Sequence, residues 1–198
     1  MNYLLIDKNP RIVDAWREAF LAFDNITILE GDITRVDCDA IVSPANSFGF
    51  MDGGVDYAIS VRLGWDLHLQ LQKEIQALPE GELLVGRSLV LKTGDAKIPY
   101  LISAPTMRVP MSFNIETSVN AYLAMKAVLI AAKKNPNINS ISIPGFCTGV
   151  GRMQPIIAAQ QMAQAFREIE LGEKPFIGNF VDAQKAHFKI NPQGKIYD

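Results

Sequence analysis

The sequence predicts an α/β fold built as one compact unit. Strand-like apolar runs alternate with helix-like amphipathic runs along most of the chain, which is the order that βα units produce. The 198 residues, 48% hydrophobic and 20% charged, are enough for one sizeable core and match a single α/β domain in size. Two strand-like runs also lead into loops that carry glycines. We therefore expect a sheet covered by helices, with functional loops at the strand ends.

Short apolar and β-branched runs predict the strands. The runs at residues 26–29 and 40–43 are expected to be internal strands, because both are apolar and bounded by turn-forming residues. The complete set of expected strands comprises residues 1–7, 26–29, 40–43, 88–93, 100–104 and 138–143.

Capping residues and helical periodicity predict the helices. Asn9 is expected to cap the first one, with Pro10 in its first turn. Asn114 is a candidate cap for the longest one, and Gly64 is expected to separate two consecutive helices. The expected ranges after the first helix are 55–63, 66–78, 115–134 and 154–171.

The whole chain, residues 1–198, is predicted to be one domain with its core at about 1–174. A boundary is expected near residues 172–175. The extension, residues 175–198, has aromatic and apolar side chains without a clean period, so we expect it to pack on the domain.

Composition narrows the functional classes. The net charge of -2 and the pI near 5.7 give no general basic field, which makes nucleic acid an unlikely partner. Asp7 and Lys8 interrupt the apolar amino terminus too early for a signal peptide or membrane span, so we expect a cytoplasmic protein with no membrane partner. Cys38 and Cys147 form no CxxC pair and lie far from any histidine, which disfavours a metal site.

Two glycine-bearing loops about a hundred residues apart are the strongest functional signal. Residues 46–56 read NSFGFMDGGVD and residues 144–151 read PGFCTGVG, and each follows an apolar strand-like run. Glycines let backbone N–H groups converge on phosphate oxygens, and a following helix adds its positive N-terminal end. The loops therefore predict a nucleotide or dinucleotide ligand, although isolated glycines also mark ordinary turns.

Stricter motifs exclude several familiar enzymes. The chain has neither GxxxxGKS/T nor GxGxxG, which disfavours a kinase, a GTPase or a nicotinamide dehydrogenase. A cysteine phosphatase needs five residues between its cysteine and arginine, but four separate Cys147 from Arg152, so a packed cysteine is the simpler interpretation. His68 and His187 are the only histidines, and nothing in the sequence brings either to a nucleophile.

Four segments follow one another in a fixed order: GDIT at residues 31–34, DAIVSPAN at 39–46, GGVDYAI at 53–59 and IPGFCTGVG at 143–151. Together they resemble the motifs of the macro domain family. Their order and spacing agree with the family over roughly residues 26–171. The resemblance implies a three-layer α/β/α fold with a central mixed, mostly parallel sheet, and a cleft at the strand ends that binds ADP-ribose.

The resemblance also implies roles for individual residues. Asp32 would accept a hydrogen bond from the adenine amino group, with Ile33 beside it, although Asp32 could also be a turn residue after Gly31. Asn46 would bond the distal ribose. Asp56 would orient or activate water, unless it only caps the following helix. The remaining implied ligand-binding residues are Gly53, Gly54 and Val55 in the first loop and Cys147, Thr148, Gly149, Val150, Gly151 and Arg152 in the second.

The sequence departs from the family pattern at three places. SPAN at residues 43–46 replaces the usual NAAN, the glycine run at 51–54 is short, and Arg152 with Met153 stand where an aromatic residue commonly follows. Phe48, Phe50 or Phe146 could supply the missing aromatic wall. No motif locates the residue that stacks on adenine, and Phe176 and Phe180 are candidates only.

The resemblance leaves three functions open. The first is an ADP-ribosyl hydrolase or O-acetyl-ADP-ribose deacetylase, in which Asn46 and Asp56 serve catalysis and no metal or cofactor is required. The second is a non-catalytic reader of free or protein-attached ADP-ribose, which would use the same cleft. The third is a pocket adapted to another nucleotide. The glycines at 149 and 151 are expected to tolerate a Cβ less well than Thr148 or Val150 tolerate substitution.

Overall fold

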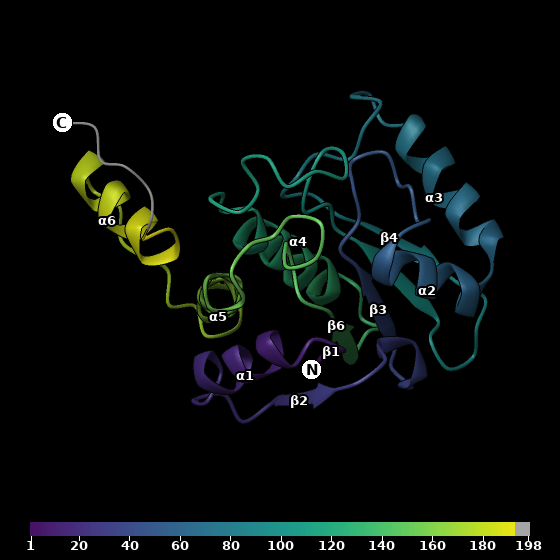
Figure 1. The fold of residues 1–198 in the computed structure, drawn as a ribbon, viewed down its shortest axis with the longest axis horizontal. Coiled ribbons are helices and arrows are strands. Elements are labelled where there is room, and N and C mark those ends of the chain that lie inside the picture. Colours follow the sequence, from purple (N-terminus) through teal and green to yellow (C-terminus); the bar gives the residue numbers. More distant parts are fainter. Residues whose placement is uncertain (193–198) are drawn as a thin grey trace.

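The computed structural model describes residues 1–192 of the chain (Figure 1). The prediction that the extension packs on the domain lies outside this range for residues 193–198. Within it, six strands form one sheet in the order β2-β1-β6-β3-β5-β4. The strands are β1 (Asn2–Asp7), β2 (Ile26–Glu30), β3 (Ala40–Ser43), β4 (Leu89–Lys92), β5 (Tyr100–Ser103) and β6 (Ser140–Ile143).

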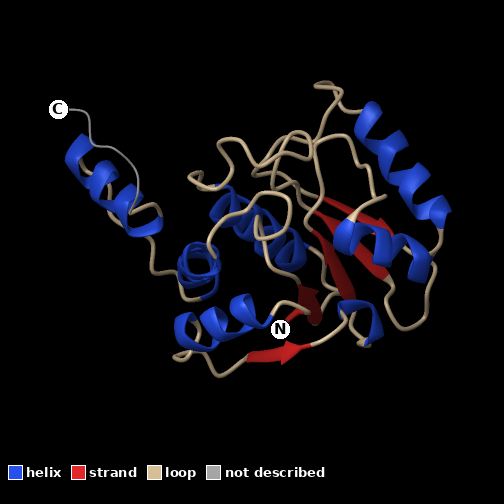
Figure 2. Ribbon diagram, viewed as in Figure 1, coloured by secondary structure: helices blue, strands red, loops and turns tan. Residues whose placement is uncertain are grey.

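Helices cover both faces of the sheet, as Figure 2 shows. Neighbouring strands pair in parallel except β4, which runs antiparallel to β5 at one edge. The fold is therefore the expected three-layer α/β/α arrangement with a mixed, mostly parallel sheet. The helices are α1 (Pro10–Ala19), α2 (Gly54–Leu63), α3 (Trp65–Gln76), α4 (Asn120–Lys134), α5 (Pro155–Glu170) and α6 (Phe180–Ile190), with a short 3₁₀ helix η1 (Ile33–Arg35).

Two apolar cores hold the layers together. On one face, α1, α4 and α5 bury residues such as Trp16, Leu129 and Phe166 against the sheet. On the other, α2 and α3 bury Ile59 and Leu71. Adjacent residues of β1 divide between the cores, because successive side chains of a strand point to opposite faces.

The helices that follow β1 and β3 lie on opposite faces of the sheet, and this arrangement positions the two glycine-bearing loops. Helix α1 follows β1 on one face, whereas α2 and α3 follow β3 on the other (Figure 1). Strand β6 lies between β1 and β3 and is parallel to both, so all three strands end at the same edge. Open α/β sheets bind ligands outside the carboxyl ends of strands at such points.

Local signals explain most of the helix ends. Asn9 accepts a hydrogen bond from the backbone of Arg11 and caps α1, as predicted. Gly64 has a φ of 98° and separates α2 from α3, also as predicted. Such a φ is open to glycine and strained for most other residues.

Two expectations about local structure are wrong. Strand β2 is at the edge of the sheet rather than inside it, and it alternates half-buried with exposed residues. Asn114 does not cap α4, which begins at Asn120. Asn114 has a φ of 63° in a turn, and Ile115 after it is buried beside Gly151, so this segment serves the second loop instead of extending the helix.

The extension forms a helix that sequence periodicity did not predict. Asn179 caps α6 by accepting a hydrogen bond from the backbone of Asp182. In Figure 1, α6 projects beyond α5 and away from the sheet. Its C-terminal end returns to the domain, because Ile190 is buried and Asn191 Nδ2 donates to the carbonyl of Thr117.

Candidate functional site

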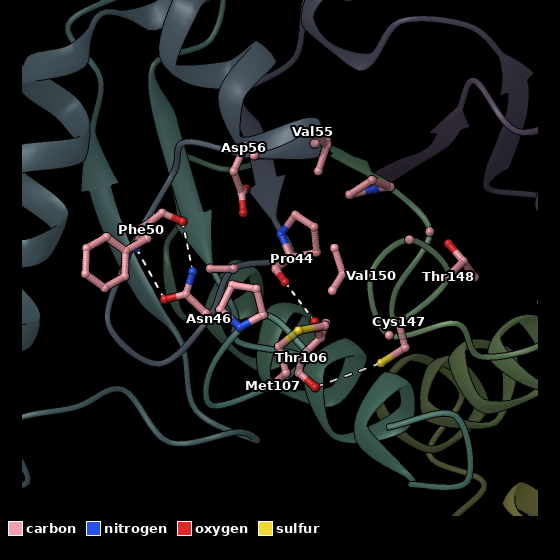
Figure 3. A pocket seen from close by; sticks show the side chains of 18 of the residues that line it. Pro44, Asn46, Phe50, Val55, Asp56, Thr106, Met107, Cys147, Thr148 and Val150 are labelled. Atoms are coloured by element: carbon pink, nitrogen blue, oxygen red, sulfur yellow. Dashed lines mark hydrogen bonds between the residues drawn. The ribbon is translucent and has the colours of Figure 1, made fainter. Parts of the chain in front are cut away.

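A cavity of about 330 Å³ opens at the carboxyl ends of β1, β3 and β6, between the two glycine-bearing loops. We call it the main cleft. Figure 3 shows Phe50 and Thr148 on opposite sides of it, with the side chain of Asp56 pointing in. The first loop contributes Asn46, Phe50, Asp52, Gly53, Gly54, Val55 and Asp56 to the lining, and the second contributes Cys147, Thr148, Gly149, Val150 and Gly151.

A second cavity of about 210 Å³ adjoins the main cleft. The two cavities share Asp7, Gly54, Val55 and Pro144 in their walls. Asp32 and Ile33 line the second cavity and not the main cleft, and we call it the Asp32 pocket. The residues expected near adenine therefore line one of two adjoining cavities, and those expected near the distal ribose line the other.

The side chain of Asn46 holds the first loop in shape. Asn46 Oδ1 accepts hydrogen bonds from the backbone N–H groups of Phe48 and Phe50, at 3.1 and 3.3 Å. Its Nδ2 donates to the carbonyl of Phe50 at 2.9 Å (Figure 3). Both acceptor sites of the amide oxygen are therefore used, and one N–H of the amide nitrogen is left for a ligand.

Asp56 is a buried carboxyl group in the wall of the main cleft. Its side chain accepts a hydrogen bond from Ser43 Oγ at 2.7 Å. Burial raises the pKa of Asp56 from its ordinary 3.8 to about 7, against the opposing effect of the Ser43 hydrogen bond, and the nearby charge of Asp52 adds to the rise. A group with this pKa changes protonation near neutral pH, as a general base requires.

The N-terminus of α2 points its backbone at the hollow. Gly53 is the N-cap and brings no side chain, so the first N–H groups of α2 are not capped by it. Asp56 lies in the first turn of α2, where a negative charge suits the helix dipole, but its side chain accepts from Ser43. Gly54 has a φ of 56° and lines both cavities. Uncapped N–H groups at a helix N-terminus attract phosphate.

The second loop is anchored to the end of β1. Asp7 Oδ2 accepts a hydrogen bond from the backbone of Gly145 at 3.0 Å. Cys147 and Arg152 adopt φ angles of 62° and 53°, which are uncommon for residues with a side chain. Strained backbone of this kind clusters at ligand-binding sites. Arg152 itself lies exposed just beyond the lining of the main cleft.

Cys147 is a packed cysteine rather than a nucleophile. The side chain is 4% exposed, and its Sγ lies 4.0 Å from the carbonyl of Thr106. Burial raises the pKa of the Cys147 thiol to about 12, so the reactive thiolate is not formed at neutral pH.

Asp32 is ionised and held in place. Lys8 pairs with Asp32 Oδ2 at 2.8 Å, while the backbone and hydroxyl of Thr34 donate to Asp32 Oδ1. These contacts, the bond to Lys8 first, lower the pKa of Asp32 to about 2. Asp32 also caps η1, so it has the role of a turn residue that the sequence left open. One lone pair of its Oδ2 remains available to a ligand in the pocket.

The structure departs from the sequence-based site at several residues. Phe176 and Phe180, the candidates for adenine stacking, are 88% and 75% exposed at the start of the extension, away from both cavities. Of the three candidate aromatic walls, Phe50 lines the main cleft, whereas Phe146 is fully buried. Gly149 has an ordinary φ and open space where a Cβ would stand, so of Gly149 and Gly151 it is Gly151 that leaves no room for a side chain.

Sequence reasoning missed the residues that support the site from other segments. Ser43 carries the hydrogen bond to Asp56, Lys8 pairs with Asp32, and Asp7 anchors the second loop. Thr106 lines the main cleft and bonds the carbonyl of Pro44. The available signal was position: Ser43 and Asp7 each end a strand of the parallel sheet at the edge where ligands bind.

Comparison with known proteins identifies the family. The family model described as Macro domain matches residues 42–162. An uncharacterized protein of Aquifex aeolicus is 36% identical over 146 residues, 74% of this chain and 83% of that protein. The macro domain-containing protein lmo2759 of Listeria monocytogenes is 35% identical over 135 residues, 68% and 74% of the two chains. The chain belongs to the macro domain family.

Solved macrodomain structures share the fold. The Oceanobacillus iheyensis macrodomain with ADP superposes with a TM-score of 0.61 at 23% identity, covering 82% of this chain and 88% of that one. The same macrodomain has also been solved as a variant with ADP-ribose, at a TM-score of 0.60. The macrodomain of Mycobacterium tuberculosis DarG gives 0.58 at 22% identity, covering 70% and 87%.

Residues 1–192 contain neither a candidate membrane span nor a candidate metal site. Over that range no helix has both the length and the apolar character needed to cross a bilayer. Over the same range no cluster of three or more His, Cys, Asp or Glu side chains is placed to hold a metal ion.

Proposed function

We propose that this protein binds ADP-ribose, with adenine in the Asp32 pocket and the distal ribose in the main cleft. The observation that carries the proposal is that the two cavities adjoin each other beside the uncapped N-terminus of α2 and the second loop. A diphosphate spanning that junction would meet backbone N–H groups from both sides. ADP and ADP-ribose are the ligands in two Oceanobacillus iheyensis macrodomain structures that share the fold.

We further propose that the protein hydrolyses an ADP-ribosyl ester, either on the acidic side chain of a protein or in O-acetyl-ADP-ribose. Ionised Asp56 would take a proton from water as the water attacks the reacting carbon. On an ADP-ribosylated carboxylate this is the distal ribose carbon, whose bond to the ester oxygen breaks. The products are then ADP-ribose and a free carboxylate. The buried carboxyl of Asp56 in the cleft wall supports this role.

A non-catalytic reader is the second candidate, and one observation favours it. The oxygen of Asn46 is fully occupied by Phe48 and Phe50, so it has no acceptor left for a ribose hydroxyl. Tight binding of ADP-ribosylated protein without turnover, and an affinity unchanged in Asp56→Ala, would support the reader. A pocket for another nucleotide would instead give AMP and ADP-ribose equal affinity in competition.

The ligand is tested by calorimetry with Asp32→Ala. Wild type is expected to bind ADP-ribose with micromolar affinity, about -8 kcal/mol. The variant is expected to bind about tenfold more weakly, because it loses a charge-assisted hydrogen bond to adenine. Asp37→Ala is the matched control, since it removes a carboxylate that is mostly exposed and pairs with Lys97. No binding by folded wild type would overturn the proposal.

We also propose that the domain core ends near residue 174. A chain truncated there loses α6, which is anchored mainly through Ile190 and Asn191. We expect the truncated protein to fold, to bind ADP-ribose within about twofold of wild type, and to lose only a small part of its stability. Thermal unfolding and calorimetry check both points. Failure to fold would place the extension within the domain core.

A further inference from the structure

Four aromatic side chains form a continuous row across α2, α3 and the first loop. The ring centroids of Tyr57 and Trp65 are 5.9 Å apart, those of Trp65 and His68 are 5.9 Å apart, and those of Phe50 and His68 are 6.4 Å apart. Each pair is tilted or edge-to-face, as interacting rings prefer. We call these residues the aromatic row.

The aromatic row is exposed rather than part of either core. Phe50, Tyr57 and Trp65 are 48%, 50% and 46% exposed, and Leu69 next to the row is 63% exposed. The core on this face of the sheet contains other residues of α2 and α3, such as Ile59 and Leu71. Large apolar side chains gathered on one surface are typical of an interaction site.

The aromatic row begins in the main cleft. Phe50 lines the cleft, and its backbone is held by the side chain of Asn46. Asp56, at which the proposed reaction would occur, also lines the main cleft and does not line the Asp32 pocket. Whatever is attached to the distal ribose would leave the cleft near Phe50 and meet His68 and Trp65 next.

Charge around the aromatic row favours a cationic partner. Asp52, in the cleft wall, and Asp66, beside Trp65, are both exposed. Arg62 of α2 is bound by the two carboxylate oxygens of Asp95, at 2.6 and 3.3 Å. Carboxylates beside aromatic rings suit lysine and arginine side chains, because ring faces attract cations, whereas they repel a phosphate backbone.

We propose that the aromatic row docks the polypeptide to which ADP-ribose is attached, and selects targets with basic and apolar side chains beside the modified residue. This inference rests on the proposed function, since it assigns the distal ribose to the main cleft. It implies that a modified protein binds more tightly than free ADP-ribose.

The test compares three ligands by calorimetry. The first is free ADP-ribose. The other two are short peptides with one ADP-ribosyl group on a glutamine amide, which replaces the scissile ester of glutamate and resists hydrolysis. One peptide has lysine and leucine around the modified residue, and the other has glycine and serine. Wild type is expected to bind the lysine-leucine peptide about fivefold more tightly than free ADP-ribose, and the glycine-serine peptide no more tightly.

Trp65→Ala is expected to remove this gain while binding free ADP-ribose as wild type does. Trp65→Phe should keep most of the gain. The control is Phe180→Ala, which removes a more exposed aromatic ring from α6, far from the cleft, and should change nothing. Because Trp65 is half exposed, the variants are expected to fold, and circular dichroism verifies this.

Three results would overturn the inference. Equal binding of all three ligands by wild type would mean that the row does not contact the target. Weaker binding of free ADP-ribose by Trp65→Ala would mean that the row supports the cleft instead. Competition by oligothymidine or oligomeric ADP-ribose, lost in Trp65→Ala, would assign the row to a nucleic acid or polymer. Absence of any ADP-ribose binding is a different result, because it refutes the proposed function itself.

Discussion

Asp56→Asn is expected to lower turnover of an ADP-ribosylated protein by about a hundredfold or more, while ADP-ribose affinity stays within about threefold of wild type. The amide cannot accept a proton from water, and loss of a general base typically costs this much. Its oxygen can still accept the Ser43 hydrogen bond, so the cleft should keep its shape. Single-turnover release of ADP-ribose from a glutamate-modified protein measures the rate, and calorimetry measures the affinity.

The pKa of Asp56 gives the wild-type reaction a characteristic dependence on pH. Because the carboxyl has a pKa of about 7, the rate should rise with pH through 7 and level off above it. Ser43→Ala removes the hydrogen bond that favours the charged form, so its profile should move to higher pH. Turnover that persists in Asp56→Asn, or a profile that Ser43→Ala leaves in place, would assign the base to another group.

Ionisation of Asp56 should raise the rate as pH rises but lower the free energy of unfolding. The folded-state pKa lies above the ordinary 3.8, so between pH 4 and 7 the folded protein binds more protons than the unfolded chain. Stability therefore falls as pH rises through this window, and at pH 8 the buried charge costs up to about 4 kcal/mol. Asp56→Asn should thus unfold at a higher temperature than wild type at pH 8, with little difference near pH 4. Equal unfolding temperatures at pH 8 would mean that the carboxylate is not destabilising.

The sequence predicted the fold well because its signals are local. Asn9 with Pro10 marks the start of α1, Gly64 separates α2 from α3, and the strand-like runs recur between the helices. The errors arise where contacts between residues far apart in the chain determine the local structure. Residues 26–30 form an edge strand. They lie at the edge because β1 pairs with β2 on one side and with the distant strand β6 on the other. Ile115 has helical propensity but packs beside Gly151 before α4 begins.

The residues of the candidate site that belong to sequence motifs could be predicted. The two glycine-bearing loops, Asn46 and Asp56 all line one cleft. Supporting contacts were not predictable, because they join residues far apart in the chain. Asp7 bonds Gly145 across 138 positions, and Ser43 becomes visible as the partner of Asp56 only after α2 folds back over β3. The row from Phe50 to Tyr57 likewise depends on how α2 packs against α3.

Gly151→Ala is expected to weaken ADP-ribose binding by about tenfold or more and to destabilise the protein by about 2 kcal/mol. A Cβ on Gly151 would stand 2.6 Å from Ile115 Cγ2 and 2.7 Å from the carbonyl oxygen of Cys147. Ile115 is buried, and the Cys147 carbonyl accepts the backbone N–H of Met153, so neither neighbour moves freely. The second loop must shift, and its contacts with the diphosphate shift with it. Chemical denaturation and calorimetry measure the two effects.

Gly149→Ala is the control for Gly151→Ala, because it also replaces a glycine of the second loop but creates no steric clash. Gly149 lines the same cleft, but its φ is ordinary and a Cβ there would meet no atom within 4 Å. We therefore expect the stability of Gly149→Ala to equal that of wild type within about 0.5 kcal/mol. Any loss of affinity in this variant must come from contact with the ligand alone, because the free loop is undisturbed. If both alanine variants lost equal stability, the second loop would not be fixed by the packing of Gly151 against Ile115 and Cys147.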